Sequence, residues 1–146
     1  MSEKQLLKVT DLNIEFHDHI IPETVVYDFD LTLNEGDIVG LVGESGSGKS
    51  MSALAIAGLL SRKDMQKRGE ILFEGVDLLT CERSLLRDIQ GNDISVIFQE
   101  PMTSLNPVFR IGDQVDEVIS LHNPDMSKED VKARTIEMLE LVGIAN

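Results

Sequence analysis

The sequence has few of the residues on which disulfide and metal chemistry depend. It contains one cysteine, Cys81, and three histidines among 146 residues. A lone cysteine cannot form an internal disulfide, and Cys81 has no cysteine or histidine at metal-ligand spacing, which is typical of a reducing compartment. Because His17, His19 and His122 follow no repeated spacing, we predict solvated side chains rather than ligands.

Basic residues and long apolar runs are also scarce. Lysine and arginine total 13 against 26 aspartates and glutamates, so the net charge is -13. A surface of this sign repels nucleic-acid phosphates, which argues against DNA or RNA as a main partner. No run approaches the roughly 20 apolar residues that a membrane-spanning helix needs, and the charged start leads into no signal-peptide core. We therefore expect the chain itself to be soluble and cytosolic.

The chain carries the pattern of alternating strands and helices. Its length and its apolar content of 42% indicate one domain, or part of a larger one. Alternating apolar residues predict half-buried strands, the first with a bulge near Thr10 and Asp11 and the second leading through a turn into a third strand. Stretches that are apolar almost throughout predict strands covered on both faces. The predicted strands are 6–16, 25–33, 38–42, 69–73 and 94–98, the last ended by Pro101.

Helix signals follow the strands. A buried helix is predicted over residues 50–60, a short one over 83–89 and another over 111–122. Ser127, followed three residues later by Asp130, predicts a capping box that opens a last helix. The apolar face predicted for this helix consists of Val131, Met138, Leu139 and Val142.

The run from Gly43 to Ser50 fits the pattern G-x-x-x-x-G-K-S between a predicted strand and a predicted helix. Its glycines permit backbone angles that turn successive N–H groups towards an anion, and the helix adds the positive end of its dipole. The chemistry predicts that Lys49 reaches the β- and γ-phosphates of ATP and that the Ser50 hydroxyl ligates Mg²⁺. The bare pattern arises by chance in roughly one chain of this length in a few hundred, so a simple glycine-rich turn is the weaker interpretation.

A second motif narrows the class of phosphate-loop protein. The run I-F-Q-E-P-M-T-S-L-N-P over residues 97–107, together with V-G-E-S-G-S-G-K-S over residues 42–50, resembles the ATP-binding subunits of ABC transporters. The resemblance is strongest to the oligopeptide, dipeptide and nickel importers, and it covers nearly the whole chain. It implies an α/β fold: a P-loop NTPase core of ABC type with an N-terminal antiparallel β subdomain.

The resemblance also implies roles for individual residues. Gln99 becomes the Q-loop glutamine, a catalytic residue with Lys49 and a magnesium ligand with Ser50, whose loop touches the membrane subunit. Phe16 is the candidate for stacking on adenine, and Tyr27, the other aromatic in range, is predicted to pack in the core. The predicted nucleotide-binding residues are Phe16, Gly43, Glu44, Ser45, Gly46, Ser47, Gly48, Lys49, Ser50 and Met51.

Other expected parts of such an ATPase do not occur in the sequence. There is no L-S-G-G-Q signature, no strand ending in Asp-Glu and no later switch histidine. We therefore expect an N-terminal segment of a longer protein that by itself binds nucleotide weakly, turns over negligibly and can pair exposed strand edges with a second copy. The expected parts are a β subdomain and P-loop core over about 1–100, and a Q-loop with the start of a helical subdomain over about 101–146.

The resemblance implies an importer of peptides or a related solute, driven by ATP hydrolysis at the cytoplasmic side of the membrane. Expected partners are permease subunits, contacted through the Q-loop region, and a second ATP-binding subunit. Alternatives remain open: a P-loop kinase or phosphotransferase, a non-transport ABC ATPase of DNA repair or chromosome organisation, and a nucleotide-sensing module. Two predicted antiparallel strands before the phosphate loop disfavour the kinases, and the acidic surface disfavours the DNA-repair class.

Overall fold

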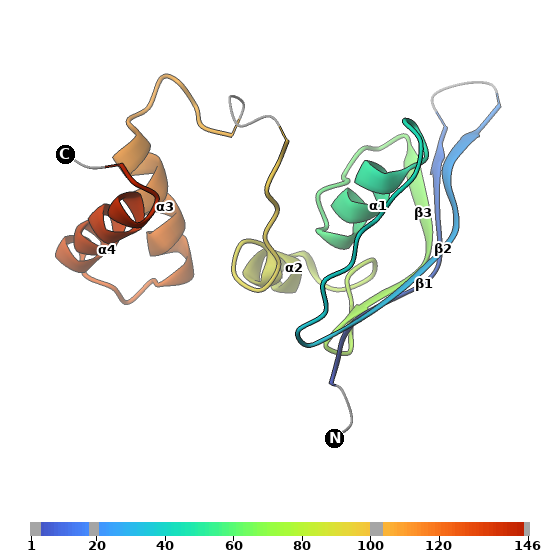
Figure 1. The fold of residues 1–146 in the computed structure, drawn as a ribbon, viewed down its shortest axis with the longest axis horizontal. Helices are drawn as coiled ribbons and strands as arrows, with labels where there is room; N and C mark the ends of the chain where they lie inside the picture. Colours follow the sequence, from blue (N-terminus) through green and yellow to red (C-terminus); the bar gives the residue numbers. More distant parts are fainter. Residues whose placement is uncertain (1–3, 18–20, 100–103, 145–146) are drawn as a thin grey trace. The chain divides into compact units, whose positions relative to one another are not determined.

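The computed structural model describes residues 4–17, 21–99 and 104–144. It divides the chain into two compact units, Met1–Ser95 and Val96–Asn146. Each unit is built around its own packing, so each is described separately (Figure 1).

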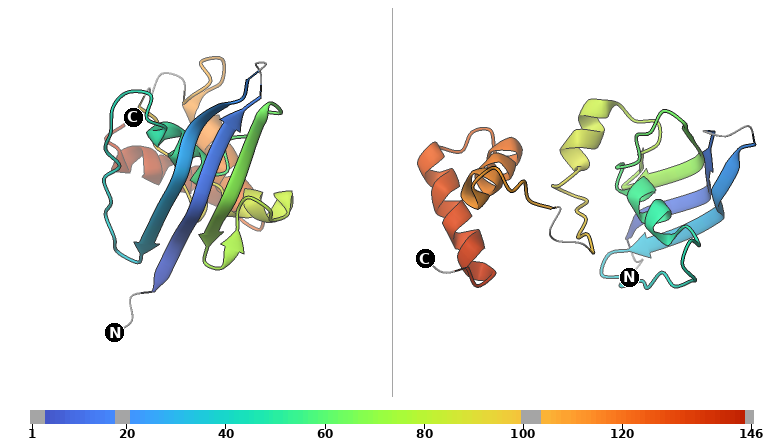
Figure 2. Two further views of the ribbon diagram at one scale, coloured as in Figure 1. Left: turned by 90° about the vertical axis from the view of Figure 1, so that its right-hand side faces the viewer. Right: turned by 90° about the horizontal axis from the view of Figure 1, so that it is seen from above.

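The first unit contains an antiparallel sheet in the order β2-β1-β3-β4. Figure 2 shows β1 running between β2 and β3. Alternating residues on these strands direct one set of side chains to the interior, as their sequence predicts. The strands are β1 (Gln5–Phe16), β2 (Glu23–Asn34), β3 (Met65–Phe73) and β4 (Val76–Asp77).

Four register shifts interrupt the pairing of β1 with β2, and two of them lie beside residues with a positive φ. Between the pairs Val9 with Leu31 and Leu12 with Phe29, β1 holds one residue more than β2, and Asp11 has a φ of 49°. This confirms the bulge predicted near Thr10 and Asp11. A second extra residue lies in β2, where Asp28 has a φ of 40°.

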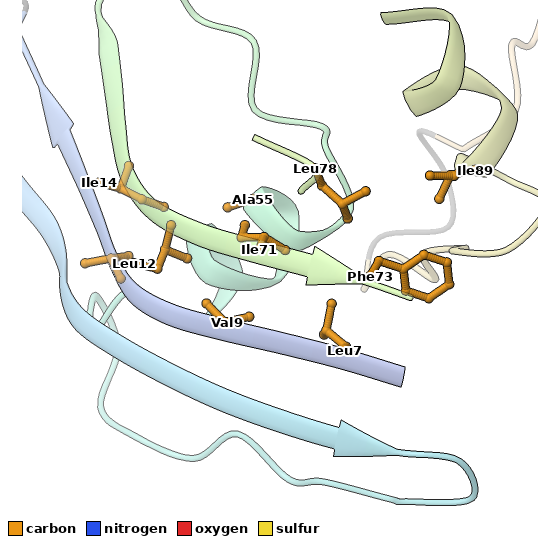
Figure 3. Close-up of a cluster of buried hydrophobic side chains, with 10 residues drawn as sticks. Leu7, Val9, Leu12, Ile14, Ala55, Ile71, Phe73, Leu78 and Ile89 are labelled. Carbon is orange, nitrogen blue, oxygen red and sulfur yellow. The ribbon is translucent and has the colours of Figure 1, made fainter. Parts of the chain in front are cut away.

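The core of the first unit lies between the sheet and helix α1 (Lys49–Ile56), with α2 (Arg83–Ile89) at one end. Figure 3 shows side chains from β1 and β3 meeting Ala55 of α1. Leu12, Ile14 and Ile71 are completely buried. The buried cluster comprises Leu7, Val9, Leu12, Ile14, Val26, Ala55, Ile71, Phe73, Leu78 and Ile89.

The two strands predicted at 38–42 and 94–98 do not form. Within the described residues, no backbone hydrogen bond joins either stretch to another strand, and only Ile94 makes a single bridge, to Gln90. Ile38 and Ile97 are 100% and 99% exposed. The predictions were wrong here because an apolar stretch becomes a strand only when another strand satisfies its backbone, and the described residues offer none. Pro101, expected to end the second strand, lies outside the described residues.

Two further predictions need correction. The helix predicted over residues 50–60 ends at Ile56, and Gly58, two residues later, has a positive φ of 69°. Only one side of this helix is buried. Tyr27, expected to pack in the core, is 70% exposed. The extra residue in β2 shifts the alternation there, so that Tyr27 faces outward.

The second unit is a helical hairpin of α3 (Ile111–His122) and α4 (Lys128–Leu141). The N-cap at Ser127 is confirmed, because its hydroxyl accepts a hydrogen bond from the Asp130 N–H at 3.2 Å; the Asp130 carboxylate accepts from that same hydroxyl at 2.7 Å, so the reciprocal bond of a full capping box is replaced by a bond between the two side chains. The interior residues of α4 are Val131 and Thr135, and Thr135 donates to Asp116 of α3 at 2.5 Å. Val142 lies beyond the helix and is 72% exposed, so its predicted place on the apolar face was wrong.

Candidate nucleotide-binding site

The glycine loop leads directly into the first turn of α1. Gly48 caps this helix with a φ of 84°, and Gly46 has a φ of 83°. Side-chain-bearing residues rarely adopt these angles, so the two glycines explain how the chain reverses within a few residues. The predicted start of the helix at Lys49 to Ser50 is confirmed.

The loop packs closely against β2. A Cβ atom at Gly48 would lie 2.5 Å from the carbonyl oxygen of Val25 and 3.0 Å from Cγ2 of Val26. A Cβ at Gly43 would lie 2.7 Å from Oγ of Ser47. Gly48 therefore allows the close backbone approach that fixes the loop against the sheet, whereas Gly43 leaves room for the Ser47 side chain of the loop itself.

The Lys49 ammonium is held by oxygen atoms of the loop itself. Its Nζ donates to the carbonyl of Gly43 at 2.9 Å, to the carbonyl of Glu44 at 2.6 Å and to Oγ of Ser47 at 3.1 Å. All three N–H groups of the ammonium are thus directed into the loop. A positive charge is concentrated at the place where the sequence predicts phosphate.

A hollow of about 290 Å³ opens beside this loop. We call it the loop hollow, and its lining residues are Val25, Gly46, Ser47, Gly48, Lys49, Ser50 and Met51. No side chain caps α1, and its first turn carries no acidic residue, so its N-terminal N–H groups have no internal anion. The donor set of backbone N–H groups, one ammonium and hydroxyl groups fits a phosphate chain.

The exposed Ser50 hydroxyl makes no hydrogen bond to the described residues. An oxygen in this state, at the edge of an anion cradle, fits a role as a Mg²⁺ ligand. Among the described residues, no group of three or more histidine, cysteine or acidic side chains could hold a metal.

The loop hollow includes one residue that sequence reasoning missed and omits several that it named. Val25 was missed because an apolar residue in an alternating strand carries no signal for ligand contact. Gly43, Glu44 and Ser45 do not line the hollow, although the carbonyls of Gly43 and Glu44 bind Lys49.

Phe16 ends β1, is half-buried and does not line the loop hollow. The Arg62 guanidinium lies 4.9 Å from the centroid of its ring. Of the histidines, His17 lies 3.4 Å from a Glu15 carboxylate oxygen, His122 ends α3, and His19 lies outside the described residues.

Gln99 belongs to the second unit, where it is exposed and outside any helix or strand. It makes no hydrogen bond to the part of the chain that the structure describes. In that same part, no helix is both long and apolar enough to cross a membrane.

Comparisons with known proteins show the family to which the chain belongs. Residues 26–146 match the ABC transporter family, and the chain belongs to that family. It is 40% identical over 144 residues to the dipeptide transport ATP-binding protein DppD of Lactococcus lactis subsp. cremoris, which covers 99% of this chain and 41% of that protein. It is 43% identical over 141 residues to the oligopeptide transport ATP-binding protein OppD of Bacillus subtilis, covering 96% and 39%.

Solved structures of the ATP-binding cassette MJ0796 share the fold. A dimeric structure of this cassette in a post-hydrolysis state matches with a TM-score of 0.78 at 22% identity, over 93% of this chain and 56% of that one. The expectation of an ABC-type fold is confirmed. The chain spans about two-fifths of the length of the two transport relatives above.

Proposed function

We propose that this chain is the nucleotide-binding part of an ABC importer subunit that couples ATP hydrolysis to the uptake of peptides or a related solute. The observation that carries the proposal is the Lys49 ammonium, held among loop oxygens beside the uncapped N-terminus of α1. The similarity to dipeptide and oligopeptide transport ATP-binding proteins supports the choice of solute.

The loop residues have separate tasks in this proposal. Backbone N–H groups from Gly46 to Met51 bind phosphate oxygens, and Lys49 neutralises the β- and γ-phosphates. To do so, the ammonium must exchange some of its bonds to Gly43, Glu44 and Ser47, so those carbonyl and hydroxyl oxygens hold the lysine ready and limit its motion. Mg²⁺ supplies charge neutralisation of the triphosphate when bound, and Ser50 and Gln99 are its proposed ligands from this chain.

Residues outside the loop complete the proposed site. Phe16 stacks on the adenine, and Gln99 senses the γ-phosphate region and transmits its state to the permease. We assign residues 1–100 to the β subdomain and phosphate-loop core, and residues 101–146 to the Q-loop and the start of a helical subdomain. The proposed partners are permease subunits and a second ATP-binding subunit, at the cytoplasmic face of the membrane. The net charge of -13 supports a function without nucleic acid.

The proposal is tested on a whole subunit that contains this chain, reconstituted with its permease in lipid vesicles. We expect ATP-dependent accumulation of a labelled mixture of di- and oligopeptides, abolished by Lys49→Ala. Lys132→Ala, which removes the same charge from the exposed surface of α4, is the matched control and should leave uptake unchanged. ATP hydrolysis that is stimulated by DNA, or transfer of the γ-phosphoryl group from ATP to an added acceptor, without any peptide uptake would contradict the importer function.

A further inference from the structure

A charged pair lies directly against Phe16. Cζ of Arg62 is 4.9 Å from the ring centroid, which is within the range of a cation–π interaction. Arg62 also donates two hydrogen bonds to Asp64, from Nε to Oδ1 at 3.0 Å and from Nη2 to Oδ2 at 2.5 Å. The hydrogen bond from Arg62 lowers the pKa of Asp64, so the carboxylate stays charged. Two N–H groups of the guanidinium thus bind Asp64, while its flat face covers the Phe16 ring.

The backbone ties this pair to the end of β1. The N–H of His17 donates to the carbonyl of Asp64 at 2.7 Å, and Phe16 pairs with Met65 across β1 and β3. Asp64 and the residue that follows it are therefore fixed to the strand that carries the aromatic ring. A rotation of the Phe16 ring would have to displace a guanidinium that is held by two hydrogen bonds to Asp64.

The end of β1 lies close to the loop hollow. Phe16 pairs with Glu23 of β2, and Val25, two residues further along that strand, lines the hollow. Strands rise about 3.3 Å per residue, so these two positions on β2 are about 7 Å apart. Phe16 is therefore paired with a strand position that lies about 7 Å from the edge of the loop hollow, and Arg62 lies over its ring.

We infer that Arg62, held by Asp64, is a positioning residue that fixes the Phe16 ring for stacking on the base of the bound nucleotide. The inference rests on the proposed function, in which Phe16 stacks on adenine. A ring that is already immobile loses less side-chain entropy when a base binds, so its stacking contributes more to affinity. With the cation on one face, the base takes the other.

The test compares two ligands that share phosphates but differ in the base. Calorimetric titrations with magnesium ATP and with magnesium tripolyphosphate should show that Arg62→Ala weakens ATP binding roughly two- to five-fold and leaves tripolyphosphate unchanged. Arg62→Lys, which keeps a cation but loses the fork, should fall between. Arg68→Ala is the charge-matched control, because Arg68 is exposed on the same sheet and contacts no aromatic ring among the described residues. It should leave the ratio of the two affinities unchanged.

Double variants show whether Arg62 acts through the ring. Phe16→Ala should weaken ATP binding more than Arg62→Ala does, and the Phe16→Ala, Arg62→Ala double variant should bind ATP no worse than Phe16→Ala alone. Additive losses in the double variant, equal losses for both ligands in Arg62→Ala, or an unchanged ATP affinity would each overturn the inference.

Failure of the proposed function has a different signature. If the wild-type chain bound neither ligand, the proposed phosphate site would be contradicted, and the inference about Arg62 would fail with it. Normal ATP binding by Phe16→Ala would contradict base stacking on Phe16 and therefore the role of Arg62. Binding of tripolyphosphate by the same variant would still support the phosphate-binding loop.

Discussion

Replacing Gly48 with alanine tests the close contact between the phosphate loop and β2. The new Cβ would lie 2.5 Å from the carbonyl oxygen of Val25, at a residue whose φ is 84°. A left-handed backbone costs an ordinary L-residue about 1–2 kcal/mol. Relief of the clash requires movement of β2 or of the start of α1, for which overpacking costs of about 1–3 kcal/mol are typical. Together they lower the free energy of unfolding by about 2–5 kcal/mol, a large part of a small domain's stability.

Gly36→Ala is the matched control for this change. Gly36 has a φ of 86°, and a Cβ there would meet no atom within 4 Å. It therefore carries the backbone cost without the clash, and the difference between the two variants isolates the contact with Val25. Urea-induced unfolding followed by far-ultraviolet circular dichroism measures that difference, and titration with magnesium ATP shows whether the loop still binds. A Gly48→Ala variant as stable as Gly36→Ala, with wild-type ATP affinity, would refute the packing argument.

Three further changes test other parts of the fold. Gly69→Ala places a Cβ 2.4 Å from the Asp11 carbonyl oxygen at the β1 bulge, whereas a Cβ at Gly75 meets no atom within 4 Å. Urea unfolding should therefore show a larger loss of unfolding free energy for Gly69→Ala than for Gly75→Ala. Burial raises the pKa of Asp77, but hydrogen bonds from Thr80, Leu79 and Ile71 outweigh this effect, so the pKa is lowered overall. Denaturant titrations at pH 7 should show that Asp77→Asn lowers the free energy of unfolding by about 1 kcal/mol. This difference from wild type should vanish as the pH falls below the unfolded-state pKa of about 3.9 and through the lower folded-state pKa. Ser127→Ala should remove the cap of α4 and reduce unfolding free energy by about 1 kcal/mol, which thermal unfolding of the second unit measures; an unchanged midpoint would contradict the cap.

Local chemistry explains which features the sequence predicted well. The bulge at Asp11, the cap at Ser127 and the turn into α1 each depend on a few neighbouring residues, whose conformational preferences are visible in the chain itself. The glycine loop is of the same kind, because positive φ angles at Gly46 and Gly48 are needed whatever the rest of the protein does.

Features that depend on distant partners were predicted less well. Residues 38–42 have the composition of an interior strand, but without a hydrogen-bonded neighbour among the described residues they stay irregular and exposed. Tyr27 was misplaced because the extra residue beside Asp28 cannot be located from alternation alone. Val25 entered the candidate site only once the contact between β2 and Gly48 was known.

In the proposed site, backbone amides and the Lys49 ammonium hold a triphosphate. The most direct measurement is isothermal titration of the chain with ATP, with and without Mg²⁺, for wild type, Lys49→Ala and the control Lys132→Ala. We predict saturable, magnesium-dependent binding at one site, unchanged by Lys132→Ala and weakened roughly 10- to 150-fold by Lys49→Ala through loss of a charged hydrogen bond. Absence of magnesium-dependent heat in the folded wild-type chain, or equal affinity in Lys49→Ala, would contradict the account.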